Sequence, residues 1–225
     1  THIQARAAGE FPVTRRWSEV LLDFITKLPV TLNGLYDSIL VVMDSTSKRV
    51  HLFPMMEKGW GAAETAELYF REVFKHHGLP DVILSDRDTR FTSKFWQNLW
   101  KLCGTHLSLT TSDHQNANPA NERVHKVIEE MLRSLTQYPP LDWDVHLPAV
   151  EFAINNSVTE TGYTPFELDT GQHPGDPRTQ WLGDLRIDND DYQDQEAMLK
   201  RWNDKLVQAH NQLNEALRLA KQSHD

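Results

Sequence analysis

The sequence has a single cysteine, Cys103, among its 225 residues. One cysteine excludes a disulfide within the chain and a zinc site built on clustered cysteines, and it is compatible with a reducing compartment. Apolar runs stop well short of the roughly 20 residues that a membrane-spanning helix needs. Residues 1–16 lack the basic and then apolar layout of a secretory signal. We therefore expect a soluble chain with no membrane partner.

Positive charge is also scarce. The chain has 23 Lys and Arg residues against 32 Asp and Glu residues, a formal net charge of −9 at pH 7. Electrostatic binding of nucleic acid normally draws on a surplus of Lys and Arg, so the overall balance argues against it. Local clustering matters more than the sum, because acids gather at 188–196 whereas Arg123, Lys126 and Arg133 lie close together.

The length and the apolar content of 39% suit one sizeable core with extensions. We expect a linker over 1–16, a compact domain over 17–175, a second linker over 176–189 and a long amphipathic helix over 190–225. Apolar residues in the last segment recur at intervals of three and four, which is typical of a coiled coil or a docked helix. We expect this helix to contact another subunit or to connect to a further module. The residues concerned are Leu199, Trp202, Leu206, Ala209, Leu213, Ala216 and Ala220.

The order of predicted elements indicates an α/β fold. Three β-rich runs with hairpin-like connections come first, and helices then alternate with single strands. This order predicts a mixed five-stranded sheet flanked by helices, as in ribonuclease H. Strands are predicted over 17–28, 36–43, 49–53, 82–84 and 106–110, and helices over 60–77, 93–102 and 142–156.

A further helix is predicted to begin near Asn118, which can cap it, with Pro119 at the first helical position. On a helical wheel, Glu122 falls opposite the apolar stripe and faces away from the local core. The stripe consists of Val124, Val127, Ile128, Met131 and Leu135, and the face opposite carries Glu122, Lys126, Glu129 and Arg133.

Three acidic residues are candidates for one site. The strand at 82–84 leads into Asp86, and Asp23 lies between apolar residues in the first strand, where burial calls for a partner or a metal. Glu122 reaches the same point from a helix. Three hard oxygen ligands suit Mg²⁺ or Mn²⁺, and two such ions about 3.5–4 Å apart suit phosphoryl transfer.

Each of these residues also has a structural interpretation. Asp23 is alternatively a polar residue on the exposed side of its strand, and Glu122 an acid favoured by the dipole at a helix N-terminus. Asp88 is the second choice for the position of Asp86, although it suits a turn held by local hydrogen bonds. Asp44 is expected to cap a hairpin.

Several stretches together resemble the integrase catalytic core of gypsy-type long-terminal-repeat retrotransposons, which is related to retroviral integrases. The resemblance runs from about residue 12 to about residue 174. It includes DFITKLP at 23–29, ILVVMD at 39–44, HGLP at 77–80, SDRDTRFTSKFW at 85–96, NER at 121–123 and EFAINNS at 151–157.

The resemblance implies that Asp23, Asp86 and Glu122 form an Asp-Asp-Glu triad, with 35 residues between the last two. It implies 3′-end processing of retroelement DNA and strand transfer, in which the 3′-hydroxyl attacks a target phosphodiester without a covalent enzyme intermediate. Two Mg²⁺ or Mn²⁺ ions are the expected cofactors. Expected partners are element-end DNA, target DNA and further copies of the chain, in the nucleus after a cytoplasmic virus-like-particle stage. The predicted DNA contacts are Lys126, Arg123, Asn121, Arg87 and His114.

Departures from the family pattern precede Glu122. The chain reads HQNANPANER at 114–123, so Pro119 stands where the family usually has a glycine, and Ser45 replaces a usual arginine. Proline fixes φ in a loop thought to close over DNA. A catalytically decayed or domesticated copy that serves as a DNA-binding or assembly module therefore remains an alternative. A true ribonuclease H is disfavoured, because it normally uses a fourth carboxylate and other spacings.

Eleven histidines are present, but only His76 and His77 are adjacent. No cysteine pair accompanies them. We therefore do not expect this stretch to hold the zinc-binding N-terminal module of a full-length integrase or its C-terminal module.

Overall fold

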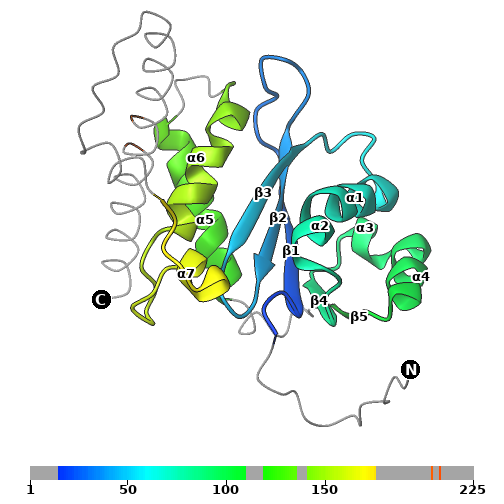
Figure 1. Ribbon diagram of the computed structural model, residues 1–225. Helices are drawn as coiled ribbons and strands as arrows, with labels where there is room; N and C mark the ends of the chain where they lie inside the picture. The colour runs from blue at the N-terminus through cyan, green and yellow to red at the C-terminus, as the bar shows by residue number, and fades with distance from the viewer. Residues whose placement is uncertain (1–14, 110–118, 136–140, 176–203, 205–207, 209–225) are drawn as a thin grey trace, which may run out of the picture.

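The computed structural model describes residues 15–109, 119–135, 141–175, 204 and 208, and it leaves out the side chains of 119–123 and 135. Five strands form one mixed sheet in the order β3-β2-β1-β4-β5, with helices on both faces (Figure 1). This confirms the predicted α/β fold. The strands are β1 (Glu19–Ile25), β2 (Ser38–Asp44), β3 (Val50–Met55), β4 (Val82–Ser85) and β5 (His106–Leu109).

Strand β1 lies at the centre of the sheet and changes its direction of pairing there. It pairs antiparallel with β2 on one side and parallel with β4 on the other. β2 pairs antiparallel with β3, and β4 pairs parallel with β5. The hairpins explain the antiparallel half, because short connections join only antiparallel strands, whereas β4 follows a helical crossover.

Helices cover the two faces in separate groups (Figure 1). Every residue of β2 is buried, as expected for a strand covered on both faces. The first group is α1 (Ala62–Tyr69), a π-helical turn η1 (Phe70–Phe74), α2 (Lys75–His77), α3 (Thr89–Thr92) and α4 (Lys94–Cys103). The second group is α5 (Pro119–Leu135), α6 (Trp143–Asn155) and α7 (Pro165–Thr170). Within the described ranges, no helix is both long enough and apolar enough to cross a membrane.

Side chains of β1 alternate between the two faces, as strand geometry requires. Val20 and Leu22 belong to the core beneath α1 and α4. Leu21 and Ile25 belong to the core beneath α5 and α6. Asp23 lies between Leu21 and Ile25 in this alternation, so it is on the face that α5 covers.

The first strand is shorter than the predicted range 17–28. Trp17 has φ 60° and Lys27 has φ 63°, both in the left-handed region that interrupts an extended strand. The predicted helix over 93–102 is found as α4, with the Ser93 hydroxyl accepting from the Trp96 amide at 3.1 Å and Gly104 ending the helix at φ 76°.

Three predictions fall mostly or wholly outside the described residues. These are the linker over 1–16, the linker over 176–189 and the long helix over 190–225. Asn118, the predicted cap of α5, also lies outside them, although α5 begins at Pro119 as predicted. The division of the chain into these segments remains a prediction.

Candidate active site

The parallel pairing of β1 and β4 places Asp23, within β1, beside the end of β4, which Asp86 follows directly. Leu22 on β1 is the register partner of Ser85 on β4, and an aspartate follows each of them. Continuing this register by one residue sets Asp23 opposite Asp86. The carboxyl ends of parallel strands in an open α/β sheet are where ligands and catalysis collect.

Asp86 lies immediately after β4 and is exposed. Its Oδ1 accepts a hydrogen bond from the Asp88 amide at 3.0 Å, which fixes the start of the turn. This single backbone contact leaves acceptor sites of the carboxylate facing solvent, because an ionised carboxylate offers about four lone pairs.

Asp88, the second choice for the site, has a structural role. Its Oδ1 accepts from the Arg90 amide at 2.9 Å, which caps α3, and both its oxygens accept from the Arg90 guanidinium at 2.8 and 2.7 Å. Hydrogen bonds from the Arg90 side chain and backbone hold the pKa of Asp88 below its ordinary value. Arg90 is buried, with its guanidinium 3.5 Å from the centre of the Phe24 ring. The interpretation of Asp88 as a turn residue is therefore confirmed.

Asp23 is half-buried and contacts α5. Its Oδ1 accepts from the Phe24 amide at 2.8 Å, and its Oδ2 lies 3.7 Å from Nε2 of His125. The sequence interpretation did not include His125. A usable signal was present, because residues 122 and 125 are three apart and such residues share one side of a helix.

Glu122 lies on α5, and its side chain is outside the described set. The backbone places residue 122 one turn before His125, which does contact Asp23. Among side chains that the structure describes, no three His, Cys, Asp or Glu lie in a group that could hold a metal ion. The convergence of all three acids therefore remains a prediction.

The predicted DNA contacts are described to different extents. Arg87 is exposed beside Asp86, and Lys126 is exposed on α5. Asn121 and Arg123 have helical backbones without described side chains, and His114 lies outside the described residues. Their proposed contacts with DNA remain predictions.

The donors at this edge of the sheet fit a hard divalent cation. Asp23 and Asp86 supply carboxylate oxygens, which Mg²⁺ and Mn²⁺ prefer. Neither side chain is fully buried, so water and substrate have access. The buried Nε2 of His125 has no hydrogen-bond partner, although it faces Asp23. A buried polar atom without a partner calls for an explanation, and the nearby carboxylate of Asp23 offers one.

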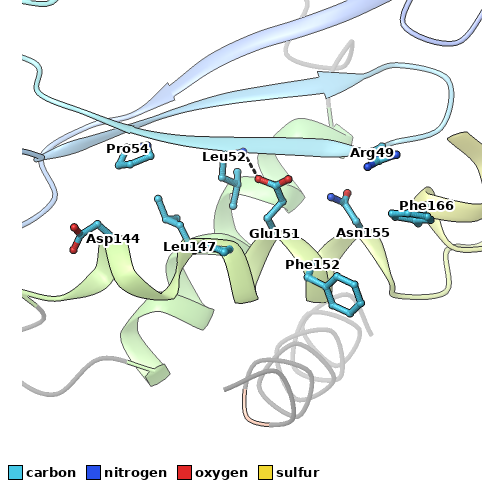
Figure 2. A pocket seen from close by; sticks show the side chains of 10 residues that line it. Arg49, Leu52, Pro54, Asp144, Leu147, Glu151, Phe152, Asn155 and Phe166 are labelled. Carbon is cyan, nitrogen blue, oxygen red and sulfur yellow. Dashed lines mark hydrogen bonds between the residues drawn. The ribbon is translucent and has the colours of Figure 1, made fainter. Parts of the chain in front are cut away.

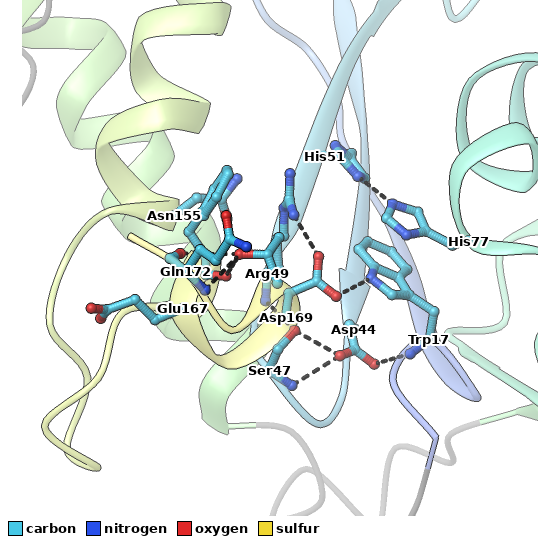
Figure 3. A network of polar contacts seen from close by, with 12 residues as sticks. Trp17, Asp44, Ser47, Arg49, His51, His77, Asn155, Glu167, Asp169 and Gln172 are labelled. Atoms are coloured by element: carbon cyan, nitrogen blue, oxygen red, sulfur yellow. Dashed lines mark hydrogen bonds and ion pairs between the residues drawn. The ribbon is translucent and has the colours of Figure 1, made fainter. Parts of the chain in front are cut away.

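A second polar cluster lies where β1 begins and the β2–β3 hairpin turns (Figure 3). The Trp17 indole N–H donates to Asp169 at 2.9 Å, and Arg49 pairs with the same carboxylate. Asp44 is fully buried and accepts from the amides of Trp17 and Ser47, both at 2.9 Å. Asp44 thus caps the β2–β3 hairpin, as predicted.

A pocket of about 330 Å³ lies between β3 and α6 (Figure 2). Its polar lining includes Glu151 and Asn155, which hydrogen-bond the backbone of β3. Leu147 and Phe166 supply apolar walls. None of the predicted site residues lines this pocket, so its polar groups serve the sheet edge.

The fold defined by this sheet and its helices is shared with solved integrase cores. One is the HTLV-2 integrase catalytic core domain in complex with magnesium, with a TM-score of 0.50, 17% identity and coverage of 68% of this chain and 96% of that chain. A second is a simian T-cell lymphotropic virus intasome bound to a PP2A regulatory subunit, with a TM-score of 0.57, 18% identity and coverage of 77% and 59%. The BIV integrase catalytic core has a TM-score of 0.51 at 17% identity, with coverage of 73% and 99%. At these identities the likeness shows the fold alone.

Sequence similarity adds a closer relationship. The Tf2-3 and Tf2-4 transposon polyproteins of Schizosaccharomyces pombe are each 30% identical to the chain over 158 residues. The aligned stretch is 70% of this chain but 12% of each polyprotein. No protein-family model matches the chain.

Fold and sequence together define the class of protein: the chain contains a retroviral-type integrase core. The family resemblance is confirmed at that level, and its assignment to the gypsy type remains a prediction.

Proposed function

We propose that this chain is the catalytic core of a metal-dependent polynucleotidyl transferase, which processes the 3′ ends of retroelement DNA and transfers them into target DNA. The observation that carries the proposal is the β1–β4 register, in which Leu22 pairs with Ser85 at the end of a parallel pair and an aspartate, Asp23 or Asp86, follows each of them. The similarity to Tf2 polyproteins and the shared fold with integrase cores support it.

The proposed cofactor is Mg²⁺ or Mn²⁺, with two ions bound by Asp23, Asp86 and Glu122. The HTLV-2 integrase core was solved in complex with magnesium, which supports a divalent metal. When bound, such ions activate the attacking oxygen and stabilise the leaving oxygen of a phosphodiester.

The chain's own residues contribute position and charge. The Asp88–Arg90 pair fixes the turn after β4, so Asp86 is held at the strand end. Arg87, which follows Asp86, and Lys126 on α5 are exposed and are proposed to bind DNA phosphates. Asn121, Arg123 and His114 are proposed to extend this surface.

The proposed partners are retroelement end DNA, target DNA and further copies of the chain. Solved structures with a similar fold include an intasome and an integrase core in trimeric form, which supports assembly around DNA. Action on chromosomal DNA requires a nuclear stage, so we propose nuclear localisation.

A strand-transfer assay tests the proposed activity. The full chain is incubated with Mg²⁺ or Mn²⁺, a labelled element-end duplex and, separately, an RNA–DNA hybrid. Strand-transfer products that disappear in Asp86→Asn and persist in Asp81→Asn, a change at an exposed aspartate before β4, are expected. Cleavage of the hybrid alone would contradict the proposal and indicate a ribonuclease H.

The second candidate is a decayed or domesticated module that binds DNA without chemistry. The net charge of −9 and Pro119 at the start of α5 favour it. The same assay separates the two candidates when duplex binding is measured beside it, since this module retains duplex binding but gives no products with either metal.

A further inference from the structure

The contact between α5 and the central strand involves a residue outside the Asp-Asp-Glu set. His125 on α5 lies with Nε2 3.7 Å from Oδ2 of Asp23 on β1. Both side chains are largely buried, with exposed fractions of 20% and 26%. The Nε2 atom itself is buried and has no hydrogen-bond partner.

The unsatisfied nitrogen calls for a physical explanation. A buried polar atom without a partner costs about 1–3 kcal/mol, so native structures seldom keep one. The separation of 3.7 Å is longer than a hydrogen bond, which runs to about 3.2 Å for N–H···O. A shift of well under 1 Å, or one bridging water, would complete the contact.

The geometry of Asp23 makes this contact consequential. Its Oδ1 is held by the Phe24 amide at 2.8 Å, and its Oδ2 faces His125. A carboxylate held at both oxygens keeps one orientation and still has lone pairs for a cation. Carboxylates that bind metals are commonly oriented in this way by hydrogen bonds from neighbouring residues.

We propose that His125 is a positioning residue for Asp23, whose Nε2–H donates to Oδ2 and fixes the carboxylate for a divalent cation. The inference rests on the proposed function and deepens it, because it assigns to α5 a role in the site beyond Glu122. His125 lies at the border of the buried face of α5, next to half-buried Val124. This border position gives the imidazole access to the strand end without displacing the core.

The Mn²⁺ affinities of matched variants test the proposal. Each affinity is measured from the electron paramagnetic resonance signal of free Mn²⁺. His125→Leu keeps the volume but removes the donor, and it is expected to weaken binding about 10-fold. His125→Gln retains a side-chain N–H of similar reach, and it is expected to stay within about 3-fold of the unmodified chain. His146→Leu, which removes a histidine of α6 that lies 3.4 Å from Asp142, is the control and should leave the affinity unchanged.

A measurement on the unmodified chain avoids any dependence on how the variants fold. Long-range ¹H–¹⁵N correlation spectra report which imidazole nitrogen carries the hydrogen, and the proposal requires Nε2–H for His125. A hydrogen on Nδ1 alone would overturn the proposal.

The outcomes also separate this inference from the proposed function. Strong loss of Mn²⁺ binding in Asp23→Asn with unchanged binding in His125→Leu contradicts the role of His125 and leaves the metal site standing. Unchanged binding in Asp23→Asn contradicts the proposed metal site and, with it, the role of His125.

Discussion

Leu22 on β1 and Ser85 on β4 are register partners in a parallel pair, and each is followed directly by an aspartate. Two carboxylates at one edge repel each other unless a cation or a proton neutralises them. A divalent cation that binds only the folded chain therefore stabilises it, by about 2.7 kcal/mol at 100 times its dissociation constant.

Removal of metal is expected to lower the thermal midpoint of the chain. Calorimetry with saturating Mn²⁺ and then with a chelator measures this difference. In Asp86→Asn the difference should largely disappear, because the site loses one ligand. An equal midpoint shift in the chain and in Asp86→Asn would show that the cation binds elsewhere.

Replacement by asparagine is expected to lower stability at Asp88 and to abolish activity at Asp86, although the two residues are only two positions apart. Asp88→Asn removes charge from the pair with buried Arg90, so we expect a loss of about 2 kcal/mol in the free energy of unfolding. Asp86→Asn should leave stability nearly unchanged and abolish Mn²⁺-dependent activity. Urea unfolding of both variants checks this contrast, and a larger loss in Asp86→Asn would reverse the two roles.

Asn155 on α6 is expected to be essential for the edge strand β3. Its amide side chain accepts from the Val50 N–H and donates to the Val50 carbonyl, both at 2.8 Å, and it is buried. Asn155→Ala leaves both backbone groups unpaired, at a cost of about 2 kcal/mol or more in unfolding free energy. It also exposes a strand edge that favours aggregation.

Urea unfolding and light scattering measure these two effects of Asn155→Ala. Asn98→Ala, at an exposed position on α4, is the matched control. Equal stability of the two variants would show that α6 does not hold the edge of β3.

The lowered pKa of His77 predicts how the stability of the folded chain changes with pH. Burial, with a contribution from His51, lowers the pKa of His77 from 6.5 to about 4. Arg49 and His76 act in the same direction and Asp169 opposes them. Between these two pKa values His77 is protonated in the unfolded chain but not in the folded chain. Stability therefore falls as pH falls from about 6.5 to about 4.

Urea unfolding at about pH 7.5 and about pH 5 measures the loss of stability that His77 causes. His77→Gln, which cannot titrate, should lose less stability between the two values than the unmodified chain. Identical losses would exclude His77 as a source of the pH dependence. In the unmodified chain, Nε2 of His51 lies 2.9 Å from Nε2 of His77. The side-chain amide of the glutamine variant can still hydrogen-bond His51.

Local patterns made most of the fold predictable. Apolar runs with hairpin connections located the three antiparallel strands, and a cap with a final glycine located α4. The role of Asp88 was predictable for the same reason, because its hydrogen bonds reach only two residues along the chain. The ends of β1 were not predictable, since Trp17 and Lys27 take positive φ values that non-glycine residues rarely adopt.

Contacts between distant segments could not be derived from local pattern. His125 approaches Asp23 because α5 covers one face of β1; its spacing of three from Glu122 places it on the same side of α5, but nothing in the local sequence shows that this side meets Asp23. The same holds for Trp17 and Asp169, which are 152 residues apart. Alternation along β1 would have indicated which face Asp23 occupies, but not which helix covers it.

The central claim, that Asp23, Asp86 and Glu122 form one metal site, is tested most directly by the Mn²⁺ affinities of Asp23→Asn, Glu122→Gln and the double variant. If the residues share one site, each single change weakens binding strongly, and the double variant is far less affected than the sum of the two effects predicts. Unchanged affinity in Glu122→Gln would contradict the claim.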